Sequence, residues 1–197
     1  MSLRVIAGTL RSRRLEAPAG SRTRPTSARV REAVFSILAN VEAARVLDLY
    51  AGSGALGIEA LSRGASYATF VEADRAALAC IRANLSELGL EARANVVPLR
   101  VGAAATRVAE LAPFDLVLCD PPWADLARAS TELAALVGAF APGARVVCEH
   151  PRRHELTIAG LAVRDRRVWG DTGVTFLERP STTPDAEPAL DPVAENG

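Results

Sequence analysis

The sequence contains no lysine, so all 23 of its basic residues are arginine, and they balance 23 acidic residues. Aromatic residues make up only 5% of the chain, and the longest stretch without a charged side chain, 133–144, has 12 residues. A membrane-spanning helix needs about 20 apolar residues, and a secretory signal needs a continuous apolar segment near the N-terminus. Because the sequence shows neither pattern, we expect a cytoplasmic protein without a membrane segment.

Cysteine and histidine are also scarce, with three and two residues. Cys80, Cys119 and Cys148 are widely spaced and each lies in an apolar run, which is typical of reduced cysteines in a core. The sequence has no CxxC pair of the kind that binds zinc. His150 and His154 belong to a segment with the composition of an exposed turn. We therefore expect reduced cysteines and no metal site.

The net charge is zero, but its distribution is uneven. Residues 1–31 contain eight arginines against one acidic residue, whereas residues 180–197 contain four acidic residues and no basic one. A basic segment on a neutral body is typical of a protein that binds a polyanion. The alternative interpretation is a solvated, arginine-rich surface, and charge alone does not separate the two.

The chain divides into three parts. Residues 1–40 form a basic N-terminal extension, in which glycine and proline predict loops up to residue 25. Thr26 or Ser27 can cap a following helix whose apolar residues recur at helical spacing: Val30, Val34, Ile37 and Leu38. We expect residues 41–179 to form the main domain, and residues 180–197, rich in proline and acidic residues, to form a disordered tail.

Within the main domain, short apolar segments alternate with longer stretches of helical periodicity. Strands are expected at 45–50, 67–72, 95–99, 115–119, 144–149, 160–168 and 173–179, and helices near 55–63, 74–88, 103–111 and 124–137. This alternation predicts an α/β fold, in which a mostly parallel sheet is covered by helices on both faces.

A glycine-rich segment, residues 46–57 (VLDLYAGSGALG), joins the first predicted strand to a helix. Gly52 and Gly54 would let the backbone turn tightly and approach a ligand at the helix N-terminus. Glu72 ends the next strand, where its carboxylate can accept both hydroxyls of a ribose. The pattern predicts a nucleotide-type cofactor, although a purely structural turn has the same glycines. Together with Gly57 it also fits the dinucleotide fingerprint, so a nicotinamide-dependent oxidoreductase is an alternative.

Asp48 favours S-adenosylmethionine over a dinucleotide. We expect this residue at the strand end beneath the turn, where it can attract the ammonium of an amino-acid ligand. A dinucleotide would bring a pyrophosphate there, which a carboxylate repels. S-adenosylmethionine carries a ribose, a sulfonium and an ammonium, but no phosphate. The alternative role for Asp48 is to cap amides of the loop.

A second motif directly follows the apolar segment 114–119 and consists of Asp120, Pro121, Pro122 and Trp123. Two prolines fix an extended turn at the C-terminal edge of a strand, where α/β folds bind ligands. The Asp120 carboxylate and the Pro121 carbonyl would accept the hydrogens of an exocyclic amine on a nucleobase, while Trp123 stacks on the ring. The alternative is a strand-ending aspartate followed by a proline stop.

With these motifs and two N-terminal blocks, the chain resembles the RsmD family, bacterial 16S rRNA (guanine-N2)-methyltransferases. The blocks are residues 4–8 (RVIAG), with the arginines that follow, and residues 24–35 (RPTSARVREAVF). The resemblance runs from about residue 4 to residue 179 and includes residues 47–63 and 120–123. Many amino-group methyltransferases share the glycine loop and the proline motif, whereas the N-terminal blocks make the resemblance specific.

The resemblance implies a Rossmann-like class I methyltransferase with a seven-stranded, mostly parallel sheet and a short basic N-terminal extension. S-adenosylmethionine would be the methyl donor, and one guanine of 16S rRNA in the 30S subunit would be the substrate. The implied cofactor site comprises Thr26, Asp48, Ala51, Gly52, Ser53, Gly54 and Glu72, and the implied catalytic motif comprises Asp120, Pro121, Pro122 and Trp123. Residues 24–26 would close over the active site.

The chain departs from the family pattern in two places. The proline motif commonly ends in Phe or Tyr where this sequence has Trp123, which keeps a stacking ring but enlarges it. Relatives tend to place an Asp or Asn after the strand that corresponds to 95–99, to meet the adenine amine, and residues 97–103 contain neither. Backbone groups would then recognise the adenine.

RNA contacts are predicted for arginines of the extension: Arg4, Arg11, Arg13, Arg14, Arg24 and Arg29. They would bind phosphates and position the RNA without reading its sequence. We expect the protein to act as a monomer.

The nearest alternative function is methylation of another amino nitrogen, such as DNA adenine N6 or a protein glutamine, and the N-terminal blocks count against it. Asp48 and the Asp120 motif disfavour an oxidoreductase. A third alternative is a non-catalytic RNA-binding protein that kept the fold.

Overall fold

A computed structural model of the chain describes residues 3–18 and 28–181. The described α-helices are α1 (Ala28–Leu38), α2 (Ala55–Ser62), α3 (Arg75–Leu88), α4 (Ala105–Glu110) and α5 (Leu126–Ala135). The strands are β1 (Arg45–Leu49), β2 (Tyr67–Val71), β3 (Ala94–Val97), β4 (Phe114–Cys119), β5 (Phe140–Pro151), β6 (Ala162–Trp169) and β7 (Thr172–Glu178). Single-turn 3-10 helices are η1 (Glu91–Arg93), η2 (Val101–Ala103), η3 (Trp123–Asp125) and η4 (Val137–Ala139).

All seven strands belong to one sheet with the order β3-β2-β1-β4-β5-β7-β6. The pairs β1–β2, β2–β3, β1–β4 and β4–β5 are parallel, and only β7 runs antiparallel to its neighbours β5 and β6. The predicted α/β fold with a seven-stranded, mostly parallel sheet is therefore confirmed. The predicted strands and helices all appear, and β5 begins at Phe140, four residues earlier than expected.

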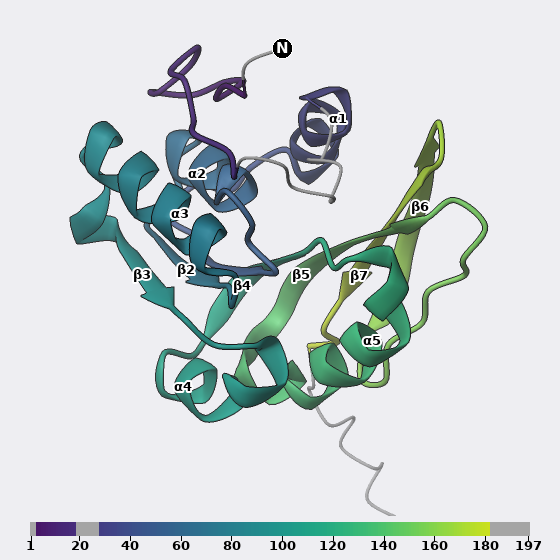
Figure 1. Cartoon of the computed structure of the whole chain (residues 1–197). Coiled ribbons are helices and arrows are strands. Elements are labelled where there is room, and N and C mark those ends of the chain that lie inside the picture. The colour runs from purple at the N-terminus through teal and green to yellow at the C-terminus, as the bar shows by residue number, and fades with distance from the viewer. Residues whose placement is uncertain (1–2, 19–27, 182–197) are drawn as a thin grey trace, which may run out of the picture.

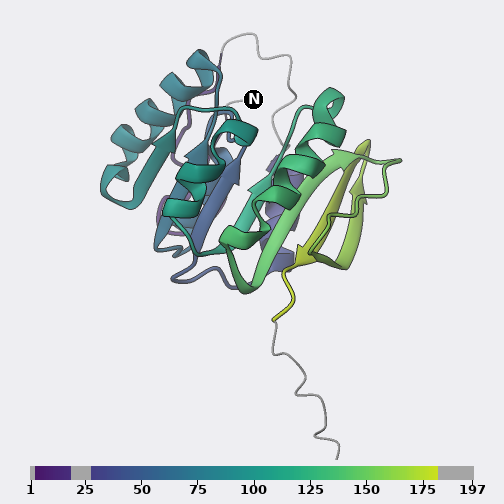
Figure 2. The same cartoon turned by 90° about the horizontal axis from the view of Figure 1, so that it is seen from below.

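The helices form a layer on each face of the sheet (Figures 1 and 2). Helices α1, α2 and α3 cover one face, and α4 and α5 cover the other. Alternate residues of β1 point to the two layers: Val46 packs in the core with α1–α3, whereas Leu47 and Leu49 pack in the core with α4 and α5. A strand buried on both faces needs apolar residues at successive positions, which explains the unbroken apolar runs of the central strands.

The described part of the N-terminal extension packs on the α1–α3 layer. Residues 3–18 turn back on themselves, with an antiparallel bridge between Arg4 and Arg14. Val5 and Leu15 are buried in the same core as α1 and α2. The prediction of loops rather than helix is confirmed for these residues, and the extension shares the core of the main domain.

A buried carboxylate, Glu59 of α2, holds this segment in place. Its two oxygens accept hydrogen bonds from the backbone N–H groups of Ile6 at 2.8 Å and Ala7 at 3.0 Å. Arg63 Nε donates to Glu59 Oε1 at 2.7 Å, and the buried Arg31 lies 3.8 Å from Glu59 Oε2. Glu59 therefore joins the extension, α1 and α2 in one polar network within the core.

The buried face of α1 runs through Val30, Val34, Phe35 and Leu38, and Ile37 is 40% exposed. One expectation about a single residue is wrong. His150 is not in an exposed turn: it lies near the end of β5, is 3% exposed and has Nε2 2.8 Å from Thr175 Oγ1 on β7. The strand extends past the apolar run because pairing with β7 continues to Pro151.

The three cysteines are free, as expected, and Cys119 and Cys148 are buried on adjacent strands. Across residues 3–18 and 28–181, no group of three or more His, Cys, Asp or Glu side chains could hold a metal ion. No helix in the described part of the chain is long and apolar enough to cross a membrane.

Candidate active site

The candidate site lies where β1 and β4 meet, at the point where the strand order of the sheet reverses. From β1 the chain proceeds outward to β2 and β3, and then returns to β4 on the other side of β1. The connections leave the C-terminal ends of β1 and β4 in opposite directions, which opens a crevice that α/β folds use for ligands. The N–H of Asp120 lies 3.4 Å from the carbonyl oxygen of Leu49, so the fold brings the two predicted motifs together.

The glycine loop turns sharply between β1 and α2. Gly52 and Gly54 both have positive φ, at 55° and 79°, and the N–H of Gly54 donates to the carbonyl of Ala51 at 2.7 Å. Among residues 3–18 and 28–181, no atom lies within 4 Å of a Cβ placed on Gly52, so the described chain leaves this side of the loop open to a ligand. A Cβ on Gly57 would instead lie 2.4 Å from Phe70, so the third glycine serves the close contact of α2 with the sheet.

Glu72 lies just after β2 and faces this loop. Its Oε2 accepts a hydrogen bond of 2.8 Å from the N–H of Gly52, and its Oε1 accepts from the N–H groups of Ala73 and Asp74 at 2.7 and 2.8 Å. A carboxylate offers about four acceptor positions, and three are used. Binding both hydroxyls of a ribose therefore requires one N–H to share or release its oxygen.

Asp48 is buried in β1 directly beneath the loop, with an exposed fraction of 1%. Its Oδ2 accepts a hydrogen bond of 2.9 Å from the N–H of Gly57, which is the capping role considered as an alternative. Burial raises the pKa of Asp48 well above its usual value, and the negative charges of Asp120 and Glu72 add to the rise, although the Gly57 N–H opposes it. A cation bound next to Asp48 would therefore stabilise the charged form of its carboxyl group.

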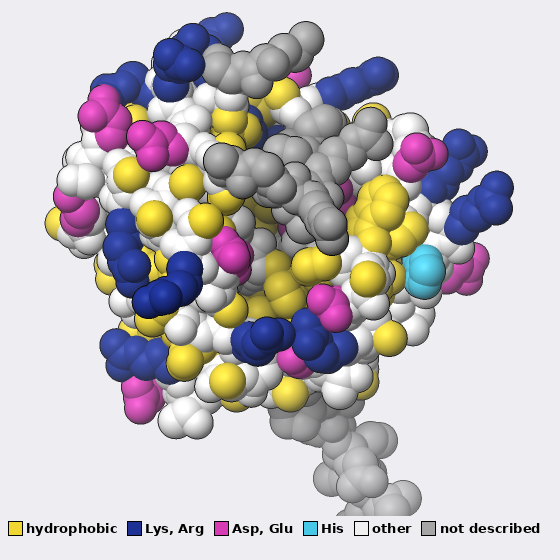
Figure 3. All heavy atoms as spheres, in the orientation of Figure 1, with side chains coloured by type: hydrophobic (Ala, Val, Ile, Leu, Met, Phe, Trp, Pro, Cys, Tyr) yellow, Lys and Arg dark blue, Asp and Glu magenta, His cyan; other side chains and the backbone are white. Residues whose placement is uncertain are grey.

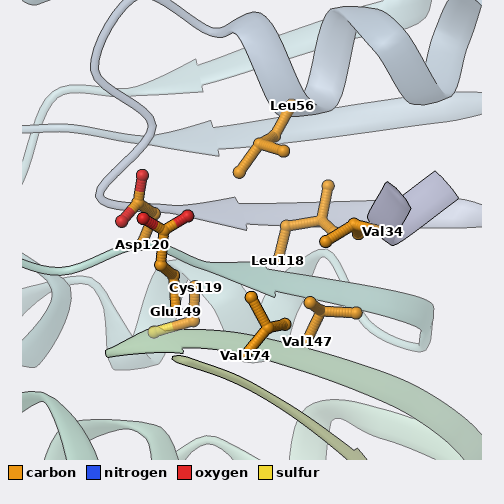
Figure 4. A pocket seen from close by; sticks show the side chains of 8 residues that line it. All are labelled: Val34, Leu56, Leu118, Cys119, Asp120, Val147, Glu149 and Val174. Carbon is orange, nitrogen blue, oxygen red and sulfur yellow. The ribbon is translucent and has the colours of Figure 1, made fainter. Parts of the chain in front are cut away.

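Asp120 lines a small open hollow beside the end of β4. Its lining residues come from α1, α2, β4, β5 and β7, namely Val34, Leu56, Leu118, Cys119, Asp120, Val147, Glu149 and Val174 (Figure 4). The carboxylates of Asp120 and Glu149 lie at the same end of this pocket, next to a wall of aliphatic side chains. The site can therefore offer carboxylate oxygens to donors on a flat, largely apolar group.

The proline motif continues from the pocket to the surface. Pro121 is buried, and Pro122 accepts a hydrogen bond of 2.8 Å from the N–H of Asp125, which closes the turn of η3. Trp123 is 42% exposed at the start of η3. This exposed indole, three residues after Asp120, is available to a planar ligand.

Sequence reasoning missed Glu149 and most of the aliphatic wall. Glu149 directly follows Cys148 in the apolar β5, just as Asp120 follows Cys119 of β4, and Cys119 pairs with Cys148 in the parallel register. The repeated pattern of an apolar strand followed by an acidic residue could have identified the pair. Val34 and Val174 come from distant parts of the chain, and their arrival at the pocket could not be predicted.

The predicted RNA contacts are only partly described. Arg24, like Thr26 of the predicted cofactor site, lies outside the described residues. Arg4, Arg11, Arg13 and Arg14 are exposed on the extension, and Arg29 is exposed on α1. Arg13 Nη2 lies 3.3 Å from Glu87 Oε1, and Arg4 Nη1 donates to the carbonyl of Ser12 at 2.8 Å. Figure 3 shows further arginines spread around this face, beyond the extension.

A family model and a relative each match nearly the whole chain. The family described as "Conserved hypothetical protein 95" matches residues 3–178. "Putative rRNA methyltransferase YlbH" of Bacillus subtilis (strain 168) is 35% identical over 187 residues, 90% of this chain and 99% of that protein. "Ribosomal RNA small subunit methyltransferase D" of Escherichia coli (strain K12) is 41% identical over 122 residues, 61% of this chain and 60% of that protein.

Solved structures also resemble this chain. The structure described as "Putative methyltransferase yhhF from Escherichia coli" has a TM-score of 0.76 with 33% identity, covering 92% of this chain and all of that one. An RNA methyltransferase from Salinibacter ruber, solved with S-adenosyl-L-homocysteine, has a TM-score of 0.64 at 18% identity and shares the fold. On the match over residues 3–178 and these relatives, the chain belongs to the RsmD family.

Proposed function

We propose that the protein is an S-adenosylmethionine-dependent methyltransferase that modifies the exocyclic N2 of a guanine in 16S rRNA. The observation that carries the proposal is the meeting of two motifs at one sheet edge: the open loop at Gly52 with Glu72, and Asp120 with its pocket. Relatives named as rRNA methyltransferases support an RNA substrate.

The residues around the glycine loop fit S-adenosylmethionine. Glu72 presents its carboxylate at the end of β2 for a ribose, the open side of Gly52 admits a ligand next to the backbone, and the buried Asp48 would favour an ammonium. No phosphate-binding group is needed, because this cofactor has none. When bound, S-adenosylmethionine supplies an electrophilic methyl group, and the N2–CH3 bond forms as the S–CH3 bond breaks.

Asp120 would prepare the amine for this attack. The lone pair of guanine N2 is delocalised into the ring, so the amine is a poor nucleophile. By accepting its hydrogens, the Asp120 carboxylate and the Pro121 carbonyl would favour a pyramidal nitrogen and orient its lone pair. Asp120 need not be a strong base, since N2 loses its extra proton only after the C–N bond has formed.

The RNA would present an unpaired or flipped guanine, because a paired base cannot enter the pocket. Trp123 would stack on the base, and the exposed arginines of the extension would hold phosphates. We place the reaction in the cytoplasm, on an assembled or assembling 30S particle, with the protein acting as a monomer.

Mass spectrometry of 16S rRNA nucleosides from a deletion strain tests this proposal. We expect N2-methylguanosine to decrease, to return with the wild-type gene, and to stay low with Asp120→Ala. An unchanged nucleoside profile together with loss of methylated DNA adenine or protein glutamine would support the nearest alternative instead. Calorimetry tests the cofactor separately: NADH should not compete with S-adenosylmethionine.

A further inference from the structure

We infer that Glu149 reads the N1–H of the target base and thereby selects guanine over adenine. This inference rests on the proposed function and extends it to base selection, for which the Asp120 motif alone gives no basis. A carboxylate that holds an exocyclic amine accepts the guanine N2 amine and the adenine N6 amine equally well. Selection therefore requires a second group beside the amine.

Strand register places Glu149 where such a group is needed. In the parallel pair β4–β5, Leu118 pairs with Val147 and Cys119 pairs with Cys148, so Asp120 and Glu149 come next on neighbouring strands. Side chains alternate between the two faces of a sheet, so Glu149 points to the same face as Val147, toward the α1–α3 layer. Figure 4 shows the Glu149 and Asp120 carboxylates at one end of the pocket.

The backbone around Glu149 is held by both neighbouring strands. Glu149 pairs with Val174 of the antiparallel β7, and the residue before it, Cys148, pairs with Cys119 of β4. The next residue, His150, is buried with its ring against Gly173, and its Nε2 lies 2.8 Å from Thr175 Oγ1. A side chain on a rigid strand can discriminate between ligands because it cannot move to satisfy the wrong one.

The hydrogen-bonding edges of the two purines differ at the atom next to the amine. Guanine presents N1–H and N2–H2, which are all donors, whereas adenine presents an N1 lone pair beside its amine. Two neighbouring carboxylates are acceptors only, so they match the guanine edge. Opposite adenine, one carboxylate would face the lone pair of N1 with no hydrogen between them, and its lost hydration would not be replaced.

2-Aminopurine separates this role from amine binding. It keeps the N2 amine of guanine but carries a lone pair on N1 instead of a hydrogen. In Glu149→Gln, the side-chain amide can donate to that lone pair. The diagnostic quantity is therefore the preference for guanine over 2-aminopurine, expressed as a ratio of kcat/KM values and compared between variant and wild type.

The experiment uses 16S rRNA ligated around a synthetic segment that carries guanine or 2-aminopurine at the methylated position, reconstituted into small-subunit particles. We expect Glu149→Gln to lower the preference for guanine about 10- to 100-fold, the value of one hydrogen bond to a charged group. Affinity for S-adenosylmethionine should stay unchanged. Glu91→Gln, an exposed glutamate in η1, is the matched control and should keep the wild-type preference.

An unchanged preference would overturn the inference. If activity also falls equally on both particles, Glu149 acts on the amine and not on N1. If Glu149→Gln does not fold, Glu149→Ala replaces it and should also lower the preference. Failure of the proposed function has a different signature, because the wild type would then leave the guanine particle unmethylated.

Discussion

The N–H of Gly52 donates a hydrogen bond of 2.8 Å to Glu72 Oε2, which connects the loop after β1 to the end of β2. The same carboxylate accepts from Ala73 and Asp74. Glu72 therefore both shapes the glycine loop and offers the group expected to bind the ribose. Both roles depend on this one carboxylate.

Glu72→Ala should weaken S-adenosylmethionine binding by about 1.5–3 kcal/mol, the usual value of hydrogen bonds to a charged group. Isothermal titration calorimetry with the cofactor and with S-adenosylhomocysteine measures this, without RNA. Glu91→Ala, an exposed glutamate far from the loop in sequence, serves as the control. Unchanged affinity in Glu72→Ala would remove Glu72 from the ribose role.

Asp120→Ala should leave folding and cofactor affinity near normal but lower turnover about a hundredfold or more, since the carboxylate acts on the amine in the transition state. Single-turnover methylation of small-subunit particles gives the rate. A variant that turns over near the wild-type rate would exclude the amine-holding role.

Trp123 tests the stacking role separately. Its side chain is 42% exposed, so substitution should not affect the core. Trp123→Phe should be mild because an aromatic ring remains, whereas Trp123→Ala should lose about 1–3 kcal/mol of base stacking, measured as RNA affinity. Equal affinities of the two variants would argue against stacking.

Asp48 should link stability to pH. Burial raises its pKa well above the usual 3.8, so the folded state keeps a proton that the unfolded chain has released. The free energy of unfolding of the apo-protein should therefore fall as pH rises from about 4 through the raised pKa. Asp48→Asn has no such titration and should lose less stability between about pH 5 and about pH 8 in guanidinium denaturation.

The same substitution should weaken S-adenosylmethionine binding, because a neutral amide no longer attracts the ammonium. A pH dependence identical to that of the wild type would show that Asp48 keeps its ordinary pKa. Cofactor affinity equal to the wild type would leave Asp48 only its hydrogen bond to Gly57.

Replacing Arg11, Arg13 and Arg14 with Ala tests the extension as an RNA clamp. Stability should change little, since the pair of Arg13 with Glu87 is exposed and such pairs contribute at most about 1 kcal/mol. RNA affinity should fall similarly for different sequences, and each lost phosphate contact should reduce the salt slope by about one unit or slightly less. Arg107→Ala on α4, on the opposite face of the sheet, is the control.

If the triple variant methylates 30S particles like the wild type, these arginines form a solvated surface and do not clamp the RNA. A variant that loses cofactor affinity would place the extension over the active site, and our division of roles would be wrong. Fluorescence anisotropy over a range of salt concentrations, together with calorimetry of the cofactor, separates the three outcomes.

Glu59→Ala should be strongly destabilising, by about 3–5 kcal/mol, because the buried Arg31 loses its ion-pair partner and the N–H groups of Ile6 and Ala7 lose their acceptor. Guanidinium denaturation gives the free energy of unfolding. Glu42→Ala, an exposed glutamate, is the control. A cost below about 1 kcal/mol would mean that the extension is held by Val5 and Leu15 and not by the polar network.

The order of the strands and helices follows from local patterns in the chain, because apolar runs and helical periodicity are local properties of a sequence. The glycine loop, Glu72 and the Asp120 motif could also be found from the sequence, since each lies at or directly after the end of a predicted strand. The wrong expectation for His150 has a long-range cause: β5 continues by pairing with β7, and the partner of His150 there, Thr175, lies 25 residues away.

The surroundings of these motifs depend on long-range packing. The pocket joins Val34, Leu56, Asp120, Glu149 and Val174, which lie on four different elements and directly after a fifth, β4. Their meeting depends on the strand order β1-β4-β5-β7, a choice among long-range pairings that no local pattern encodes. Strand register then sets which side chains share a face, and it is this register that puts a second carboxylate, Glu149, beside Asp120.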